Sequence, residues 1–308
     1  MLTALDLGLI YGLMALGVYL TFRVLDFPDL TVDGSFTTGG AVAASLIIAG
    51  QPPLAATLLG AVAGGVAGLI TGVLHTKGKI NPLLAGILTQ IALYSINLRI
   101  MSKANLPLLR TDTLLSGMRD AHLFGSWASV VIFGLLAAVF LLLLDWFLNT
   151  DLGLALQATG DNARMIRANG MSTDFTIILG LVMSNALVGL CGALVAQYQG
   201  YADISMGIGL IVAGLASVII GQVLVPSRRF VVATLAVVLG SVVYRLVIQL
   251  ALSVGLNPND MKLISAILVI VFLLLPRLSF FRAMRARAKD RRLAAAAAAD
   301  GPDKPLEA

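Results

Sequence analysis

The residue types that carry enzyme chemistry are few and scattered in this sequence. His75 and His122 are the two histidines, and Cys191 is the one cysteine, each in a different segment. A metal site or a cysteine–histidine nucleophile needs several such groups at one place, so neither is expected. Residues Gly72 to Ile80 only approach a nucleotide-binding loop, because the spacing is too long and Ile80 replaces the required Ser or Thr. The sequence therefore predicts that this chain is not an enzyme and holds no metal or nucleotide cofactor itself.

The segment 26–40 carries three aspartates, several hydroxyl groups, Pro28 and three glycines into a region that is otherwise apolar. Irregular backbone at membrane depth is tolerated only where it is buried in protein or lines an aqueous cavity. One interpretation is a broken helix that lines a pathway. The alternative is a polar turn at the cytoplasmic surface, followed by a spanning helix that starts near Phe36.

Arg245 lies inside another apolar segment, with Tyr244 and Gln249 beside it. A charge near the middle of a membrane costs at least ~2.5 kcal/mol unless it meets a cavity or a partner. One interpretation is structural, in which Arg245 reaches outward to water or pairs with Asp203 or Asp260. The other is functional, in which it faces a pathway and meets a substrate anion.

Asn97 and Arg99 allow the same two interpretations, and the nearby end of their segment favours an outward position. In the functional interpretation, polar side chains of three segments line a substrate pathway. These residues are Asp33, Ser35, Thr37, Asn97, Arg99, Tyr244, Arg245 and Gln249.

The segment 149–173 is too polar to span a membrane and too regular to be disordered. Gly160 divides it, and Asp161 is expected to cap a short helix that Asn169 and Gly170 end. Such a helix lies along the membrane surface or docks on a cytoplasmic partner; a plain surface helix is the alternative. The residues expected to form its cap, its polar and apolar sides and its end are Asp161, Arg164, Met165, Ile166, Arg167, Asn169 and Gly170.

Glycines occupy every fourth position along one face of the segment 54–74, at Gly60, Gly64, Gly68 and Gly72. Small residues let two helix backbones approach closely within a membrane. This stripe predicts close helix packing, either inside the chain or at a subunit interface.

Long apolar segments lie between these polar features, and their number and length are typical of a membrane protein. Hydrophobic residues make up 58% of the 308 residues and charged residues 12%, whereas soluble domains have roughly 45–50% and about 25%. The expected fold is all-α and polytopic, with about nine transmembrane segments of ~20 residues, one of them broken or irregular near 26–40. The candidate segments are 3–22, 31–49, 54–74, 82–101, 127–148, 174–198, 208–225, 230–253 and 262–276.

The chain is expected to form one transmembrane domain, 1–276, with a cytoplasmic loop at about 149–173 and a tail over 277–308. That tail is first basic and then of low complexity. Seven of the 21 basic residues lie in 277–292. Because cytoplasmic segments are enriched in Lys and Arg, the C-terminus is predicted inside and the N-terminus outside.

Three stretches resemble the integral membrane permeases of bacterial ABC importers of the branched-chain amino acid and ribose type. The resemblance is closest to the branch of tryptophan and tyrosine transport permeases, and it extends over about residues 5–276. The stretches are LDFPDLTVDGSFTTGGAVAA (25–44), GKINPLLAGILTQIALYSINLRIM (78–101) and GLALQATGDNARMIRANGMSTD (153–174). The last is similar to the family's cytoplasmic coupling loop, with Gly153, Asp161, Asn169 and Gly170 at positions that resemble the family's.

The resemblance implies a transport subunit in the bacterial inner membrane that hydrolyses nothing itself. It implies a second permease copy, usually as a homodimer, above two ATPase subunits that bind ATP and Mg. A periplasmic or lipid-anchored binding protein would deliver a small solute, in this family an amino acid or related compound. A secondary transporter driven by an ion gradient and an intramembrane enzyme remain as alternatives.

Overall fold

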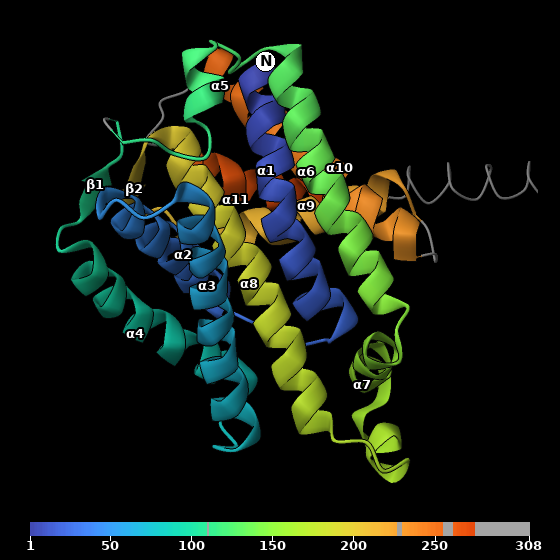
Figure 1. The fold of residues 1–308 in the computed structure, drawn as a ribbon. Helices are drawn as coiled ribbons and strands as arrows, with labels where there is room; N and C mark the ends of the chain where they lie inside the picture. Colours follow the sequence, from blue (N-terminus) through green and yellow to red (C-terminus); the bar gives the residue numbers. More distant parts are fainter. Residues whose placement is uncertain (110, 227–229, 255–260, 275–308) are drawn as a thin grey trace, which may run out of the picture.

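The computed structural model describes residues 1–109, 111–226, 230–254 and 261–274, and these residues are mostly helical (Figure 1). This confirms the all-α, polytopic class. The predicted tail, 277–308, lies outside the described residues, and so does Asp260. In chain order the helices are α1 (Leu2–Tyr19), the π-helix η1 (Leu20–Val24), α2 (Thr31–Ile48), α3 (Pro53–Thr76), α4 (Pro82–Met101), α5 (Ser116–Asp120), α6 (Trp127–Leu148), α7 (Asp151–Ala168), α8 (Thr173–Gln199), α9 (Leu210–Leu224), α10 (Phe230–Ser253) and α11 (Met261–Leu274).

Six helices in the described ranges are long and apolar enough to cross a membrane: Leu2–Val24, α3, α4, α6, α8 and α10. The expected count of about nine is therefore not confirmed. The other three expected segments do form helices, but α2 has a polar first half, α9 has 15 residues and α11 has 14. At 1.5 Å per residue α9 extends only ~22 Å, which is less than the ~30 Å of a bilayer's hydrocarbon core.

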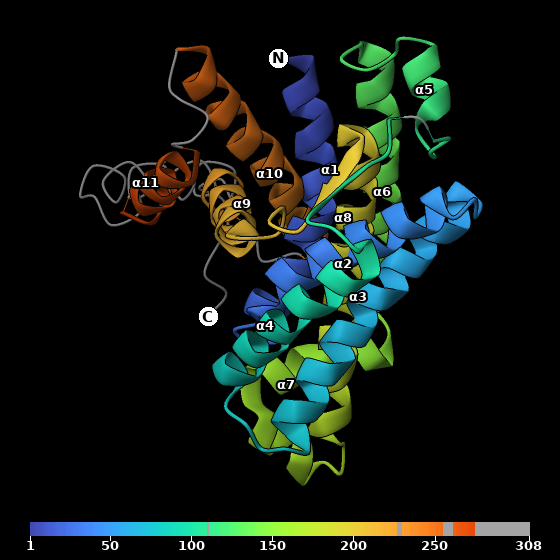
Figure 2. The same ribbon diagram turned by 90° about the vertical axis from the view of Figure 1, so that its left-hand side faces the viewer.

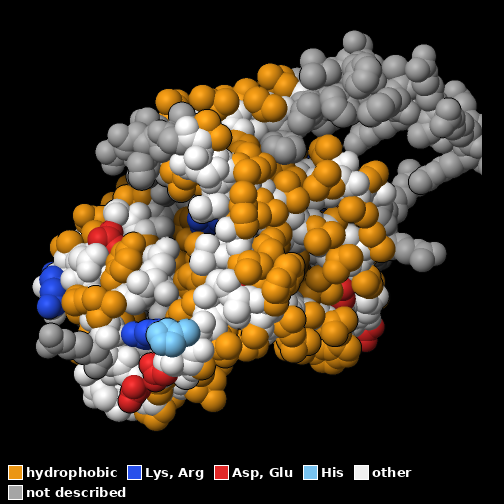
Figure 3. Space-filling view, turned by 90° about the horizontal axis from the view of Figure 1, so that it is seen from above, with side chains coloured by type: hydrophobic (Ala, Val, Ile, Leu, Met, Phe, Trp, Pro, Cys, Tyr) orange, Lys and Arg blue, Asp and Glu red, His pale blue; other side chains and the backbone are white. Residues whose placement is uncertain are grey.

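Helix α8 is the centre of the packing, with α1, α2, α3 and α7 against it (Figures 1 and 2). Helix α4 packs on α2 and α3, while α9 and α10 pack on each other and on α1. Strands β1 (Asn105–Pro107) and β2 (Tyr201–Asp203) pair antiparallel, with Leu106 opposite Ala202. Figure 3 shows the end of the molecule where α1 begins, on which apolar and polar side chains are mixed. The flanks of α3, α4 and α6 expose many large apolar residues, as expected of helices that contact lipid.

The glycine stripe of α3 lies against α8 of the same chain. A Cβ on Gly64 or Gly68 would overlap the backbone carbonyl of Asn185 or Leu181, so only glycine allows this approach. The stripe is thus occupied by packing within the chain, whereas other faces of α3 expose large apolar residues, among them Leu58, Val62 and Val66.

The irregular segment is shorter than the sequence predicted. Only residues 25–30 leave the helix, and 31–48 are one continuous helix. The glycines of α2 do not break it; they serve close packing, since a Cβ on Gly39 would overlap the Gly189 carbonyl on α8. Helix α2 starts at Thr31 because the Asp29 carboxylate accepts a hydrogen bond from the Thr31 backbone N–H at 2.9 Å. Within this turn Asp29 is fully buried, whereas Asp26 is exposed, so only part of the turn reaches the surface.

Candidate functional site

Three cavities adjoin one segment, the turn over residues 204–209 that connects β2 to α9. The hairpin cavity, of about 450 Å³, is lined by Ser205 and Met206 of this turn and by Asp203. The α2–α4 cavity, of about 380 Å³, and the α9–α10 cavity, of about 290 Å³, share Ile208. Non-helical backbone among membrane helices is tolerated where it lines a cavity, so this turn marks the candidate pathway.

Asp33 connects α2 to the start of α9. Its carboxylate accepts hydrogen bonds from the backbone N–H groups of Gly209 and Ile211, both at 2.8 Å. A negative charge is favourable here, because the N-terminus of a helix carries a partial positive charge. Asp33 also lines the α2–α4 cavity together with Thr37.

Ser35 faces away from that cavity and belongs to a buried network. It donates to the Asn185 side-chain oxygen at 2.6 Å, and the Asn185 amide nitrogen donates to the Asp29 carboxylate at 2.7 Å. This network fixes α2 against α8. Ser35 does not line the α2–α4 cavity, and its hydroxyl is committed to the helix interface, so its place in the pathway stays a prediction.

Asn97 and Arg99 lie on different sides of α4. Asn97 is 1% exposed and lines the α2–α4 cavity, whereas Arg99 is exposed. Neither the amide nitrogen nor the carbonyl oxygen of the Asn97 side chain has a hydrogen-bond partner in the described part of the chain.

Arg245 turns inward to Tyr11 of α1. Its guanidinium carbon lies 3.5 Å from the centroid of the Tyr11 ring, a cation–π contact. The suggested pair with Asp203 is wrong, because Asp203 accepts hydrogen bonds from Ser205 and Asn105 instead.

The residues beside Arg245 differ in their surroundings. Tyr244 and Arg245 both line the α9–α10 cavity, and the Tyr244 hydroxyl is 2.9 Å from the Ser265 hydroxyl. Gln249 is half-buried. This cavity therefore offers a cation and hydroxyl groups next to the start of α9.

The hairpin cavity has a negative group at its rim. Burial raises the pKa of Asp203, but hydrogen bonds from Ser205 and Asn105 outweigh burial and bring the pKa below its ordinary value. Asp203 is therefore ionised at neutral pH, as a carboxylate that hydrogen bonds stabilise.

Helix α7 is bent at Asn162, where φ is −157° and ψ is 84°. The side-chain oxygen of Asn162 accepts from the Met165 backbone N–H at 3.1 Å, so Asn162, and not Asp161 as predicted, caps the second arm. The arm ends at Ala168 with Asn169 as its C-cap, followed by Gly170 in the left-handed conformation at φ +81°.

The two arms of α7 differ in burial. The first arm packs closely: a Cβ on Gly153 would overlap the Phe147 carbonyl, and the Thr159 hydroxyl is 2.9 Å from that of Thr176 on α8. The second arm exposes Arg164, Met165 and Arg167. Ile166 is only 6% exposed, so its predicted place on a free docking face is wrong.

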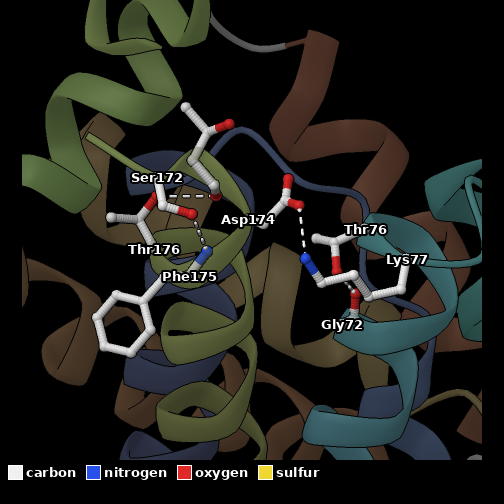
Figure 4. A network of polar contacts seen from close by, with 8 residues as sticks. Gly72, Thr76, Lys77, Ser172, Asp174, Phe175 and Thr176 are labelled. Carbon is white, nitrogen blue, oxygen red and sulfur yellow. Dashed lines mark hydrogen bonds and ion pairs between the residues drawn. The ribbon is translucent and has the colours of Figure 1, made fainter. Parts of the chain in front are cut away.

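The ends of α3 and α8 meet beside α7 (Figure 4). The Lys77 ammonium and the Asp174 carboxylate form an ion pair at 3.3 Å, and Ser172 caps α8 by accepting from the Phe175 N–H. Both charged side chains are exposed, so this pair adds little stability but aligns the two helix ends.

Two buried carboxylates were not recognised from the sequence. Asp6 accepts hydrogen bonds from the hydroxyls of Ser129 and Tyr198, and Asp145 accepts from Thr234. The available signal was an aspartate near the end of an apolar helix, in the first turns of α1 and in the last turn of α6, because such a group requires a partner.

Comparison with known proteins covers nearly the whole chain. Residues 1–297 match the family described as "Branched-chain amino acid transport system / permease component". The tyrosine transport system permease protein of Clostridioides difficile (strain R20291) is 46% identical over 268 residues, which are 86% of this chain and 88% of that protein. The galactofuranose transporter permease protein YtfT of Escherichia coli (strain K12) is 27% identical over 90% of this chain and 80% of its own. A solved inward-facing metal-chelate type ABC transporter has a similar fold, with 17% identity, a TM-score of 0.50 and coverage of 89% and 83%.

Proposed function

We infer the function of this chain from its family, because it belongs to the branched-chain amino acid transport system permease components. It is a membrane-embedded permease subunit of an ABC transport system, and not an enzyme. Such a permease works with an ATPase and with a substrate-binding protein. We propose that ATP and Mg bind to the separate ATPase chain, since this sequence has no nucleotide-binding loop.

We propose an amino acid as the solute. The relative that is 46% identical is named for tyrosine transport. The α2–α4 and α9–α10 cavities would form its path, with Asp33, Thr37, Asn97, Tyr244 and Arg245 in contact with it. Polar groups of both signs along this path suit a zwitterion better than an apolar solute.

We propose that the chain forms a homodimer and that its transmembrane domain extends over 1–276. One side of α4 exposes large apolar residues, including Leu84, Leu88 and Ile91, although this helix borders a candidate cavity. A second copy against this side would enclose the cavity. In that arrangement α2, α9 and α11 complete the membrane region as shorter or more polar segments, for about nine in all.

We propose that the second arm of α7 transmits motion from the ATPase, and one observation supports this: its exposed side carries Arg164, Met165 and Arg167 next to the ion-paired ends of α3 and α8. The arm is anchored through the first arm and through buried Ile166. A rigid element of this kind can move α8, which contacts helices on both sides of the candidate path.

The test is co-purification of the tagged permease with the ATPase encoded beside it, followed by reconstitution into liposomes. We expect ATP hydrolysis that the loaded binding protein stimulates, and uptake that an ionophore leaves unchanged. Uptake that follows an imposed ion gradient without ATP would contradict the proposal and identify a secondary transporter.

The proposed orientation, with the N-terminus outside, has its own test. The start of α1 and the α7 region lie at opposite ends of the molecule (Figure 1). We expect a fluorescent protein fused to the C-terminus to be fluorescent, and alkaline phosphatase fused there to be inactive. The opposite pair of results would place α7 on the wrong side for an ATPase.

A further inference from the structure

The α2–α4 cavity contains a buried amide without a partner among the described residues. Asn97 is 1% exposed, yet neither of its polar side-chain atoms makes a hydrogen bond. It lines this cavity together with Gln90, Tyr94 and Ser95 of the same helix. A buried polar group without a partner raises the free energy of the folded state, so its position calls for a ligand or a water molecule.

Asn185 is a comparable buried amide, but both of its polar side-chain atoms have hydrogen-bond partners. It is also fully buried, but its nitrogen donates to the Asp29 carboxylate and to the Leu181 carbonyl, and its oxygen accepts from Ser35. Burial therefore does not by itself prevent an amide here from being satisfied. Asn97 differs because this residue borders a cavity, and both of its buried amide atoms lack a partner among the described residues.

The charge of the cavity selects the kind of ligand. Among the described residues that line it, Asp33 contributes a carboxyl group and none is basic. The Asp33 oxygens each accept one backbone N–H, and each can accept a second hydrogen bond. The N-terminus of α9 offsets only about half an elementary charge, so the cavity attracts a cation and disfavours an anion.

The remaining wall is apolar. Ile91, Ile204 and Ile208 line the cavity, and the half-exposed ring of Tyr94 adds an aromatic surface. A ligand that fits this lining has one cationic, hydrogen-bonding end and an apolar body.

We propose that the α2–α4 cavity is a binding site for the α-amino group of the transported solute, and thus a specificity site within the permease itself. The ammonium group donates to the Asp33 carboxylate and to Asn97 Oδ1, while Asn97 Nδ2 donates to an oxygen of the same solute. The apolar body lies along the isoleucines and Tyr94. This site rests on the proposed transport function, but its occupancy can be measured without an ATPase.

The test uses a thiol placed in the cavity of the purified permease. Ser95 is exposed and lines the cavity, whereas the native Cys191 is fully buried, so Ser95→Cys provides a selective target for a maleimide. The probes are L-phenylalanine, phenethylamine, which lacks the carboxylate, and 3-phenylpropionate, which lacks the amine. A probe present at a concentration of about four times its Kd slows labelling about fivefold, if the maleimide reacts only with permease whose site is empty.

We expect L-phenylalanine and phenethylamine to slow the labelling of Ser95→Cys, and 3-phenylpropionate to leave it unchanged. Ser253→Cys, exposed at the end of α10, is the matched control and should be labelled at one rate with every probe. Protection by 3-phenylpropionate alone, or by no probe, overturns the proposal. So does a Ser95→Cys thiol that never reacts, because the cavity would then be closed to soluble ligands.

Two further substitutions, each combined with Ser95→Cys, assign the contacts. Asn97→Leu should abolish protection while keeping or raising the melting temperature, because it removes an unsatisfied buried amide. Asp33→Asn keeps an acceptor for the start of α9 and should remove the preference for amines. Protection that survives both substitutions overturns the site. A permease that binds amines but never associates with an ATPase would refute the transport function and leave this site standing.

Discussion

The guanidinium group of Arg245 on α10 lies over the aromatic ring of Tyr11 on α1, with its central carbon 3.5 Å from the ring centroid. The Tyr11 ring in turn stacks on Phe36 of α2, with ring centroids 5.8 Å apart. Tyr11 lines the hairpin cavity and Arg245 lines the α9–α10 cavity. This pair therefore separates two cavities and joins three helices.

The first prediction concerns this contact. Arg245→Leu should leave assembly intact and lower uptake, because the substitution removes a charge from the path and a cation–π contact worth ~0.5–2 kcal/mol. Tyr11→Phe keeps the aromatic face and should retain most of the stability. Melting temperatures and uptake rates of both single variants and of the double variant measure the coupling. If Arg245→Leu prevented assembly, a structural role would be favoured; unchanged uptake would remove Arg245 from the path.

The second prediction concerns the contact between α3 and α8. Gly64→Ala should destabilise the permease by ~1–3 kcal/mol, because a Cβ there overlaps the Asn185 carbonyl and lies 2.9 Å from Gly189 Cα. Gly117→Ala on α5 is the control, since a Cβ at that position meets nothing within 4 Å. Thermal unfolding in detergent measures both. Equal melting temperatures for the two variants would mean that α3 and α8 separate more easily than their packing indicates.

The sequence predicted the helices well because their apolar segments are long. Within the described residues all nine expected segments coincide with helices, and the Asn169–Gly170 stop was correctly placed, since a left-handed residue after a helix favours glycine. The number of spanning helices was not predictable in the same way. Length and composition identify α6 as a spanning helix, whereas the placement of α2 depends on the tertiary burial of polar groups such as Asp33 and Ser35.

The candidate site was harder to predict because side-chain direction depends on the packing of distant helices. Ser35 and Asp33 are two residues apart on one helix, but the first contacts α8 and the second the start of α9. Neither the contact of Arg245 with Tyr11 nor the burial of Ile166 follows from hydrophobic periodicity. Both require the positions of other helices, which one sequence does not give.

The third prediction concerns the buried network around Asn185. Asn185→Leu should lower stability by about 1–3 kcal/mol for each group left unsatisfied, because the Asp29 carboxylate and the Ser35 hydroxyl lose their partner. Asn97→Leu, an identical change at an unsatisfied amide, should not lower it. Melting temperatures of the two variants, measured side by side, provide the comparison. A similar loss in both would show that Asn97 is satisfied in the protein.

The last prediction concerns the second arm of α7, where the structure separates two neighbouring residues. Met165 is half-exposed and lies on the free side with Arg164 and Arg167, whereas Ile166 is buried. Met165→Asp should leave the melting temperature nearly unchanged, because the new charge remains in water. It should weaken the contact with the ATPase, where each charge-assisted hydrogen bond of a desolvated arginine contributes about 1.5–3 kcal/mol.

Ile166→Asp is the matched comparison at the next position. It buries a charge without a partner, so it should unfold the arm and lower the melting temperature before any effect on coupling can be measured. Pull-down of the ATPase, stimulated ATP hydrolysis and uptake distinguish the two variants. Met165→Asp with normal ATPase binding and normal uptake would refute the coupling role of α7. An uncoupled Met165→Asp permease, with ATP hydrolysis but without uptake, would instead show that this exposed side transmits the motion, because the rest of the helix is unaltered.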